Sequence, residues 1–393
     1  ARVIEICNEI GIIRKPCIGS SGSSLVNYCL DITKINPIEY DLIFERFLNS
    51  HTNNQPVFNM DIQPLLHLDV NDLIYKEIIL DRLKYYHPEY NIYFIAYKAK
   101  DKTKYEKVTY NGDEYSQHPS CMIITTDDLE KTTFTYNDKR FYYTKDLVND
   151  PVCADKIYIE ESMEYLISLK KLEYKISEYY NPYEIPLNDQ KVFEFLTSGD
   201  TENTLIFDDS NIKRALKDFK PQSINDIAIL DTICRPGATK LMPIVIYNKN
   251  YGYEKFDNQL LNLLLKETYG VLIYQETFLK ILYSIADMSY DEAEFWRMKL
   301  FRTKSDEFPN LINQLFDLID KEANDLSQSD FDKLKDMVEC NFKSTFIKAH
   351  SLGLSIISYW GAYSKFYYNK EFLDVFNNQE KTISEYVFML CKL

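Results

Sequence analysis

The sequence has no clustered cysteines and no long apolar run. Its eight cysteines are scattered without a CxxC pair, which argues against a zinc site built on paired cysteines and favours reduced thiols over disulfides. No stretch of about 18 uncharged apolar residues occurs, and acids interrupt the N-terminal segment. These absences predict a cytoplasmic protein without a signal peptide or a membrane span. Because the first residue is not Met, we also suspect a fragment.

Positive charge is scarce as well. The chain has 45 basic and 60 acidic residues and a net charge of -15, which opposes uniform attraction to a polyanion. Any contact with nucleic acid therefore needs a local basic patch. Residues 341–370 contain no acid, and we predict that they form this patch. Its cations are Lys343, Lys348, His350, Lys365 and Lys370.

The patterning that is present predicts an α+β half followed by a helical half. A chain of 393 residues with 45% apolar residues can bury the cores of two or three domains. Alternating polar and apolar residues predict a strand over 57–63 and short strands within 105–160, whereas 70–100 has a helical pattern that breaks at His87-Pro88. After the prolines near 182–186 the chain is mainly helical to its end.

Tyrosine is abundant, with 32 copies against two tryptophans. Such side chains offer stacking surfaces for bases. The alternative is that tyrosine, together with the many Ile, Asn and Lys residues, reflects an AT-rich coding sequence. Both interpretations stay open at this point.

A Gly/Ser loop precedes an apolar helical segment near the N-terminus, in GSSGSSLVNYCLDIT (19–33). This order places the loop at a helix N-terminus, where exposed backbone amides favour an anion. The simpler alternative is a flexible turn before an ordinary helix.

The order of the motifs resembles the bacterial DNA polymerase III alpha subunits, the C-family replicative polymerases. The loop above and NPIEYDLIFERFLN (36–49) resemble the start of that family's palm. TYGVLIYQE (268–276), DEAEFWRMKLFRTK (291–304) and FIKAHSLGLSIISYWGAYSKFYY (346–368) resemble motifs of its fingers. The resemblance covers nearly the whole chain.

This resemblance implies a fold and a domain division. The expected fold is α+β, a polymerase-beta-like nucleotidyltransferase palm with an inserted short thumb, followed by a mainly helical fingers domain. Residues 1–68 and 118–170 are then palm, 69–117 a shortened thumb and 171–393 the fingers. Glu45 and Arg46 are read as an ion pair inside the palm, with the neighbouring aromatics in its core.

The resemblance also implies a metal site with fewer carboxylates than the family has. Three aspartates of the family hold two Mg²⁺ ions, because polymerisation needs both the primer hydroxyl and the triphosphate to be held by metal. Asn59, Asp61 and Tyr158 stand at their positions, so Asp61 is the one expected catalytic and metal-binding residue. Asp61 as a single solvated acid is the alternative.

A shifted register would change this expectation, because other acids lie close by in the sequence. Asp155, Glu160 or Glu161 would then supply a second carboxylate for the metal.

The same resemblance suggests which residues bind substrate. Ile18 replaces an arginine of the loop, which removes a bidentate phosphate donor. Gln117 likewise replaces a lysine beside His118. The expected substrate-binding residues are Gly19, Ser20, Ser23, Ser24, His118, Arg235, Arg297, Lys348 and His350.

Three functions follow as hypotheses. The leading one is a homologue of DNA polymerase III alpha, related to DNA replication, that binds nucleic acid or a partner and has lost most or all catalysis, a pseudoenzyme. The second is an active DNA-directed DNA polymerase, phage or mobile-element encoded, that uses Mg²⁺ and a compensating acid near Asp61. The third is a protein-interaction module that does not bind DNA. By resemblance the partners are primer-template DNA, deoxynucleoside triphosphates and replisome proteins. Whether the chain is an enzyme stays open.

Overall fold

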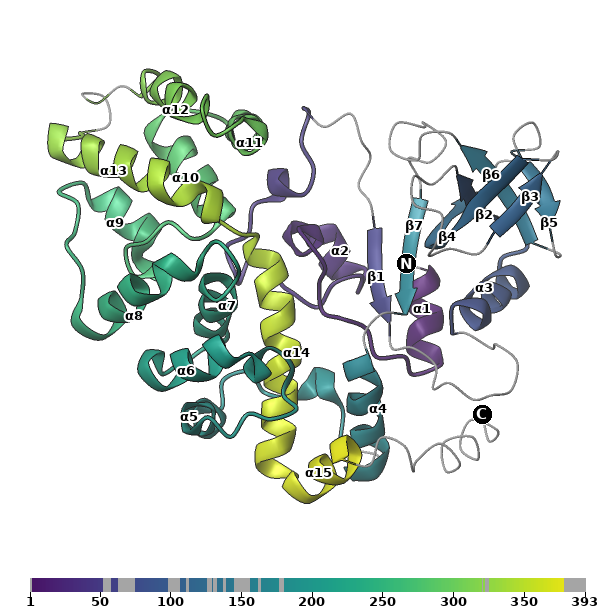
Figure 1. The fold of residues 1–393 in the computed structure, drawn as a ribbon. Coiled ribbons are helices and arrows are strands. Elements are labelled where there is room, and N and C mark those ends of the chain that lie inside the picture. The colour runs from purple at the N-terminus through teal and green to yellow at the C-terminus, as the bar shows by residue number, and fades with distance from the viewer. Residues whose placement is uncertain are drawn as a thin grey trace.

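A computed structural model describes most of the chain (Figure 1). For β1 and β7, defined below, the description covers the backbone. The described residues are 2–51, 58–62, 75–97, 107–110, 113–125, 129, 133–136, 139–144, 156–161, 164–176, 180–319, 321 and 325–377. Within them, no helix has the length and apolar character that crossing a bilayer demands.

The first half combines helices with one sheet. Its helices are α1 (Arg2–Glu9), η1 (Ser21–Ser23), α2 (Leu25–Cys29), η2 (Phe44–Arg46), α3 (Tyr75–Tyr86) and α4 (Glu164–Ile176). Its strands are β1 (Phe58–Ile62), β2 (Asn91–Tyr97), β3 (Lys107–Tyr110), β4 (Asp113–Thr125), β5 (Thr133–Tyr136), β6 (Lys139–Thr144) and β7 (Lys156–Glu161).

The seven strands form a single mixed sheet. Their order is β1-β7-β4-β2-β6-β5, and β3 pairs with β4. β1 runs parallel to β7, and β4 runs antiparallel to both β7 and β2. Helix α3 contacts β7 and α1, and a small core of α1, α3 and sheet residues includes Ile79, Leu83 and Phe141.

The second half is helical. Its first helices are η5 (Pro182–Glu184), α5 (Gln190–Ser198), η6 (Leu205–Asp208), α6 (Ser210–Phe219), α7 (Ile224–Ile233), η7 (Thr239–Leu241), α8 (Met242–Tyr251), α9 (Gln259–Leu265) and η8 (Lys266–Thr268). Then follow α10 (Gln275–Ile285), α11 (Tyr290–Arg302), α12 (Phe308–Phe316), α13 (Gln328–Asn341), η9 (Phe342–Ser344), α14 (Lys348–Tyr367) and α15 (Asn369–Asn377).

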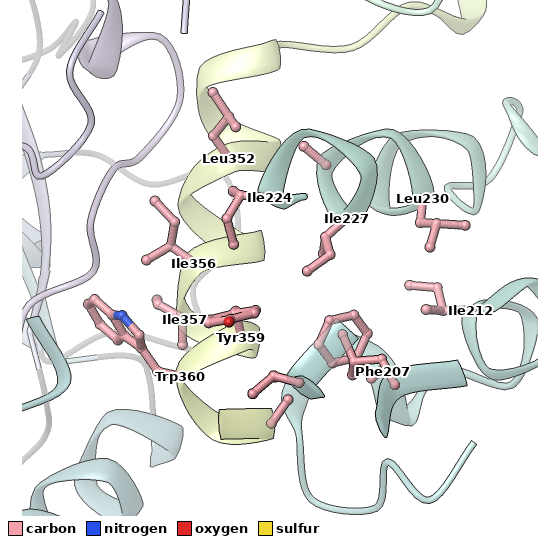
Figure 2. Packing of buried hydrophobic residues seen from close by; sticks show 14 of the residues in the cluster. Phe207, Ile212, Ile224, Ile227, Leu230, Leu352, Ile356, Ile357, Tyr359 and Trp360 are labelled. Atoms are coloured by element: carbon pink, nitrogen blue, oxygen red, sulfur yellow. The ribbon is translucent and has the colours of Figure 1, made fainter. Parts of the chain in front are cut away.

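Helix α14 is the central element of this half. It runs between α7, α5 and η6 on one side and α4 and α15 on the other (Figure 1). In the largest core cluster, Tyr359 of α14 points toward Ile227 of α7 and Phe207 of η6, whereas Ile356 points to the other side of α14 (Figure 2). A second cluster joins α9 to α13 and includes Ile43 from the N-terminal half. The two halves of the chain therefore share their cores.

Several expectations from the sequence are confirmed. A strand lies at 58–62, a helix at 75–86, further strands lie between 107 and 161, and most of the residues described after 180 are helical. The predicted helical pattern over 70–100 holds only as far as residue 86, because 91–97 forms β2. The expected thumb boundary at 117/118 falls inside β4, and β2 and β3 belong to the same sheet as β7. The division into palm and thumb stays a prediction.

The prediction of a basic patch over 341–370 is wrong, because two of its four lysines, Lys348 and Lys365, are buried in ion pairs. Lys343 Nζ donates to three carbonyl oxygens at the end of α11, at 2.6 to 3.1 Å. Lys348 Nζ lies 2.8 Å from a carboxylate oxygen of Glu267, and Lys365 Nζ lies 2.6 Å from Asp200. Although residues 341–370 contain no acid, the charges of Lys348 and Lys365 are thus balanced by acids from other parts of the chain. Lys343 and Lys370 are exposed, whereas Lys348 and Lys365 are buried.

The approach of the N-terminal loop to α14 generates a stability prediction. A Cβ atom added to Gly353 would lie 2.7 Å from the Cys17 carbonyl oxygen. We expect Gly353→Ala to lower the free energy of unfolding by about 1–2 kcal/mol, because the strain of overpacking exceeds the helical gain of alanine over glycine. Urea unfolding measures this. A variant as stable as the parent would contradict the close approach.

Candidate functional site

The Gly/Ser loop lies along the first turns of α14. Gly22 approaches Ala349, with 3.4 Å between an added Cβ and the Ala349 Cβ atom. The backbone N–H of Gly19 donates to Nδ1 of His350 at 3.0 Å, and Gly19 itself has the left-handed φ of +58° that favours glycine. The structure therefore joins Gly19 and His350, two of the expected substrate-binding residues.

Several serine side chains of the loop make hydrogen bonds to backbone groups of the same segment. Ser24 caps α2, because its side chain accepts from the Asn27 N–H at 3.2 Å. Ser21 Oγ donates to the Ile18 carbonyl at 2.7 Å, and Ser20 is half-buried. The expectation that the loop ends at a helix N-terminus is confirmed, although α2 has only five residues.

Ser23 is the exception in the loop. Its buried hydroxyl has no hydrogen-bond partner among the described residues. It borders a cavity of about 380 Å³ whose other walls are mostly apolar. The further lining residues are Leu25, Val26, Pro37, Ile38, Asp41, Leu42 and Phe44.

Two cations stand near the loop. Burial, followed by the charges of Lys15 and Arg235, lowers the pKa of His350 from 6.5 to about 4. His350 is therefore neutral at neutral pH, and its Nδ1 is free to accept the Gly19 N–H. The positive potential of Lys15 and Arg235 favours an anion beside the loop. Sequence reasoning missed Lys15, although its place just before the loop was a signal.

Arg235 is held in position by the helical half. Its guanidinium lies 2.9 Å from Asp231 one turn earlier and 3.8 Å from the centre of the Phe346 ring. Ser351 Oγ of α14 donates to the same Asp231 carboxylate at 2.7 Å. Burial raises the pKa of Asp231, with Arg235 and Ser351 opposing the rise.

The N-terminus of α14 is closed by a carboxylate of the protein itself. The Lys348 N–H donates to both oxygens of Glu276, at 2.9 and 3.0 Å. Lys348 is only 3% exposed, and its Nζ donates to Glu267 and to the Tyr40 carbonyl. A phosphate at this helix end would have to displace Glu276. Lys348 is thus placed in the interior, away from solvent.

Arg297 is likewise internal. Its guanidinium makes two hydrogen bonds to Glu294, at 2.6 and 2.7 Å. Arg46 of η2 adds a contact of 3.6 Å to the same carboxylate and donates to Gln275 at 2.8 Å.

The reading of Glu45 and Arg46 as an ion pair inside the palm is therefore wrong. Arg46 contacts the helical half instead, and the neighbouring Phe44 is 46% exposed. Burial, followed by the charge of Arg297, lowers the pKa of Arg46.

The last turn of α11 and the residues after it present cations to solvent. Lys299, Arg302 and Lys304 are exposed, as is Phe301. Residues 295–305 contain no acid. Sequence reasoning singled out Arg297 in this helix and missed the three exposed cations. The run of four cations among three aromatics was the available signal.

The strands that carry the expected metal site are neighbours. In the parallel register of β1 and β7, Asn59 is the partner of Tyr158 and Asp61 the partner of Glu160. His118 lies in β4, where Cys121 pairs with Tyr158. Asp155 lies outside the described residues.

Where side chains are described, no three His, Cys, Asp or Glu residues gather closely enough to bind a metal ion.

Comparisons with known families identify the relatives of this chain. The model of the bacterial DNA polymerase III alpha NTPase domain matches residues 1–77, and that of the alpha subunit finger domain matches residues 161–323. The chain is a divergent DNA polymerase III alpha-like protein.

Individual relatives agree with this assignment. The DNA polymerase III subunit alpha of Ureaplasma parvum is 28% identical over 433 residues, which cover 95% of this chain and 44% of the relative. Those of Aquifex aeolicus and Thermotoga maritima are 26% and 25% identical, and each alignment covers 95% of this chain, with 39% and 44% of the relative. The chain therefore spans less than half the length of these relatives.

The contact between Gly19 and His350 predicts a dependence of stability on pH. The pKa of His350 is lower in the folded protein than in the unfolded chain. Between pH 6.5 and 4, His350 is therefore protonated in the unfolded chain and still neutral in the folded protein. As the pH is lowered through this window, we expect the free energy of unfolding to decrease by up to about 3 kcal/mol. Denaturant unfolding of the wild type and of His350→Gln, measured between pH 7 and 4, isolates this contribution.

In His350→Gln the amide oxygen still accepts the Gly19 N–H, but nothing at position 350 titrates. The difference between the two proteins should therefore change across the window. A difference that stays constant with pH would contradict a lowered His350 pKa.

Proposed function

We propose that this chain is a nucleic-acid-binding body built on the palm and fingers of a DNA polymerase III alpha-like protein, with nucleotide addition weak or absent. The observation that carries the proposal is the internal pairing of the fingers cations. Arg297 is held by Glu294 and Lys348 by Glu267, so neither presents its charge to a triphosphate.

The loop supports the same conclusion. The amide of Gly19 is used by His350, and Ile18 stands where the family has an arginine. Lys15 and Arg235 remain close to the loop, which suits a single phosphate of a nucleic-acid backbone. A triphosphate needs more donors than these groups supply.

The metal site is reduced as well if the resemblance is carried over residue by residue. Mg²⁺ would lower the pKa of the primer hydroxyl and hold the triphosphate. Asn59 and Tyr158 offer no carboxylate where the family has aspartates. Asp61 is then the remaining metal-binding residue, and Mg²⁺ is a cofactor only if activity persists.

The exposed face of α11 is the nucleic-acid contact that we propose. Lys299, Arg302 and Lys304 extend from the end of the helix and the residues that follow. Their charges contrast with the acidic balance of the chain. Contacts of this kind position a duplex through its phosphates without reading its sequence.

We expect the triple variant Lys299→Ala/Arg302→Ala/Lys304→Ala to weaken binding of primer-template DNA. Each lost phosphate contact removes about 0.9 from the slope of log K against log salt concentration. The slope should therefore fall by up to about three. Fluorescence anisotropy at several salt concentrations measures both affinity and slope.

The matched control replaces three exposed lysines elsewhere, Lys191, Lys255 and Lys370, by alanine. An equal loss in the control would show that net charge matters and the α11 face does not. If the wild type does not bind primer-template DNA, a protein-interaction module of the replication machinery becomes the better account.

One observation favours the second hypothesis, an active polymerase. Asp61 and Glu160 are register partners on adjacent parallel strands, and residues in register lie close together in a sheet. Two carboxylates on neighbouring strands are the minimum for holding a metal ion at the growing primer end. Asp61 and Glu160 would be those ligands.

Primer extension separates the two functions. We expect no incorporation of a complementary nucleotide by the wild-type chain in Mg²⁺ or Mn²⁺, because too few carboxylates remain to hold two metal ions. Incorporation that disappears in both Asp61→Asn and Glu160→Gln would overturn this expectation and establish the active polymerase. Incorporation that survives both variants would point to a contaminating enzyme.

A further inference from the structure

The outward face of α8 carries large side chains that the core does not use. Ile244, Tyr247 and Tyr251 are 50%, 60% and 78% exposed. They follow one another at helical spacing and form one stripe. The opposite face holds the helix in place through the buried Val245 and through Asn248, which donates to the Tyr269 carbonyl at 2.8 Å. The stripe is therefore dispensable for docking α8 on the protein.

The two tyrosines of this stripe form a pair. Tyr247 and Tyr251 have ring centroids 5.1 Å apart and planes inclined by 41°. Rings with exposed flat faces are the surfaces on which unpaired bases stack, each such contact contributing about 1–3 kcal/mol. A tyrosine pair one helical turn apart offers two of these faces side by side.

The neighbouring helix α6 carries exposed cations. Helix α6 packs against α8 (Figure 1), and Asn250 Nδ2 donates to the Asp218 carbonyl near the end of α6 at 2.9 Å. The exposed residues at this end of α6 include Arg214, Lys217 and Lys220, with one acid, Asp218.

The sequence around α8 strengthens this charge. The segment 234–253, which contains the whole helix, has no acid, and Lys240 within it is exposed. In a chain with a net charge of -15, the surface of α6 and α8 is thus locally basic and aromatic.

We propose that the surface of α6 and α8 is a binding site for single-stranded nucleic acid. Bases stack on Tyr247 and Tyr251, and the cations of α6 contact the phosphates between them. The combination of basic groups with exposed aromatic faces is what binding of single strands without sequence preference requires. An apolar protein partner would have no use for the three exposed cations of the neighbouring helix α6.

This site is separate from the proposed contact on α11. It requires neither nucleotide addition nor the exposed cations of α11, so it stands if the proposed function fails. Testing it in the Lys299→Ala/Arg302→Ala/Lys304→Ala background keeps the two failures apart.

The experiment is the binding of a fluorescent oligothymidine to the whole chain, followed by anisotropy. Tyr247→Ala and Tyr251→Ala should each weaken binding roughly five- to a hundredfold, whereas Tyr247→Phe should retain most of it because the ring remains. Lys217→Ala/Lys220→Ala should lower the salt slope by up to about 1.4. The matched control is Tyr85→Ala/Tyr86→Ala, another exposed tyrosine pair, with 5.2 Å between rings.

Each outcome of this experiment either supports or overturns the proposed site. Weaker binding in the α8 variants, with no change in the Tyr85 and Tyr86 control and unchanged circular dichroism, supports the site. Equal loss in the control would show that tyrosines bind without regard to place and would overturn it. A wild-type chain that fails to bind the oligothymidine, or α8 variants that bind like the wild type, would also overturn it.

Discussion

The structure depends on how the first turn of α14 is held. Glu276 accepts the N–H of Lys348, and the Lys348 side chain is paired with Glu267. A buried lysine without its carboxylate, or a buried carboxylate without its donors, costs several kcal/mol, so this arrangement fixes the helix in one position. The Gly/Ser loop is then seated through Gly19 on His350 and through Cys17 on Gly353. The loop, α7 and α14 form one unit because a carboxylate of the protein itself, Glu276, accepts the hydrogen bond from the N-terminus of α14.

Internal pairing of charged side chains also explains why we propose nucleic-acid binding without nucleotide addition. Groups that pair inside the protein, such as Arg297 with Glu294, stabilise the fold but no longer offer their charge to a ligand. Groups left outside, such as Lys299 and Arg302 on α11, add charge where the acidic chain otherwise repels a polyanion. A protein that still has to bind nucleic acid, but no longer adds nucleotides, is expected to keep its fold and to lose the cations that bind a triphosphate.

Much of this was predictable from the sequence, for physical reasons. The alternation around Asp61 predicted β1, and the Gly/Ser run before Leu25 predicted the start of a helix, because both signals are local. The fate of the lysines in 341–370 was not predictable, since Lys343 and Lys365 find partners far away in the sequence. For the same reason Arg46 was assigned to Glu45 next to it, when its partners are Gln275 and Glu294. The exposed Lys299 and the α8 tyrosines required the structure, because a sequence does not show which face a fold leaves uncovered.

The most direct test measures how fast primer-template DNA dissociates from the chain, with and without the complementary deoxynucleoside triphosphate and Mg²⁺. A nucleotide held in an active site couples to the bound DNA and slows its release, since each ligand then stabilises the other. We predict the same dissociation rate in both conditions. A clearly slower release with the complementary nucleotide, and not with a mismatched one, would contradict the account and show that the fingers still position a substrate.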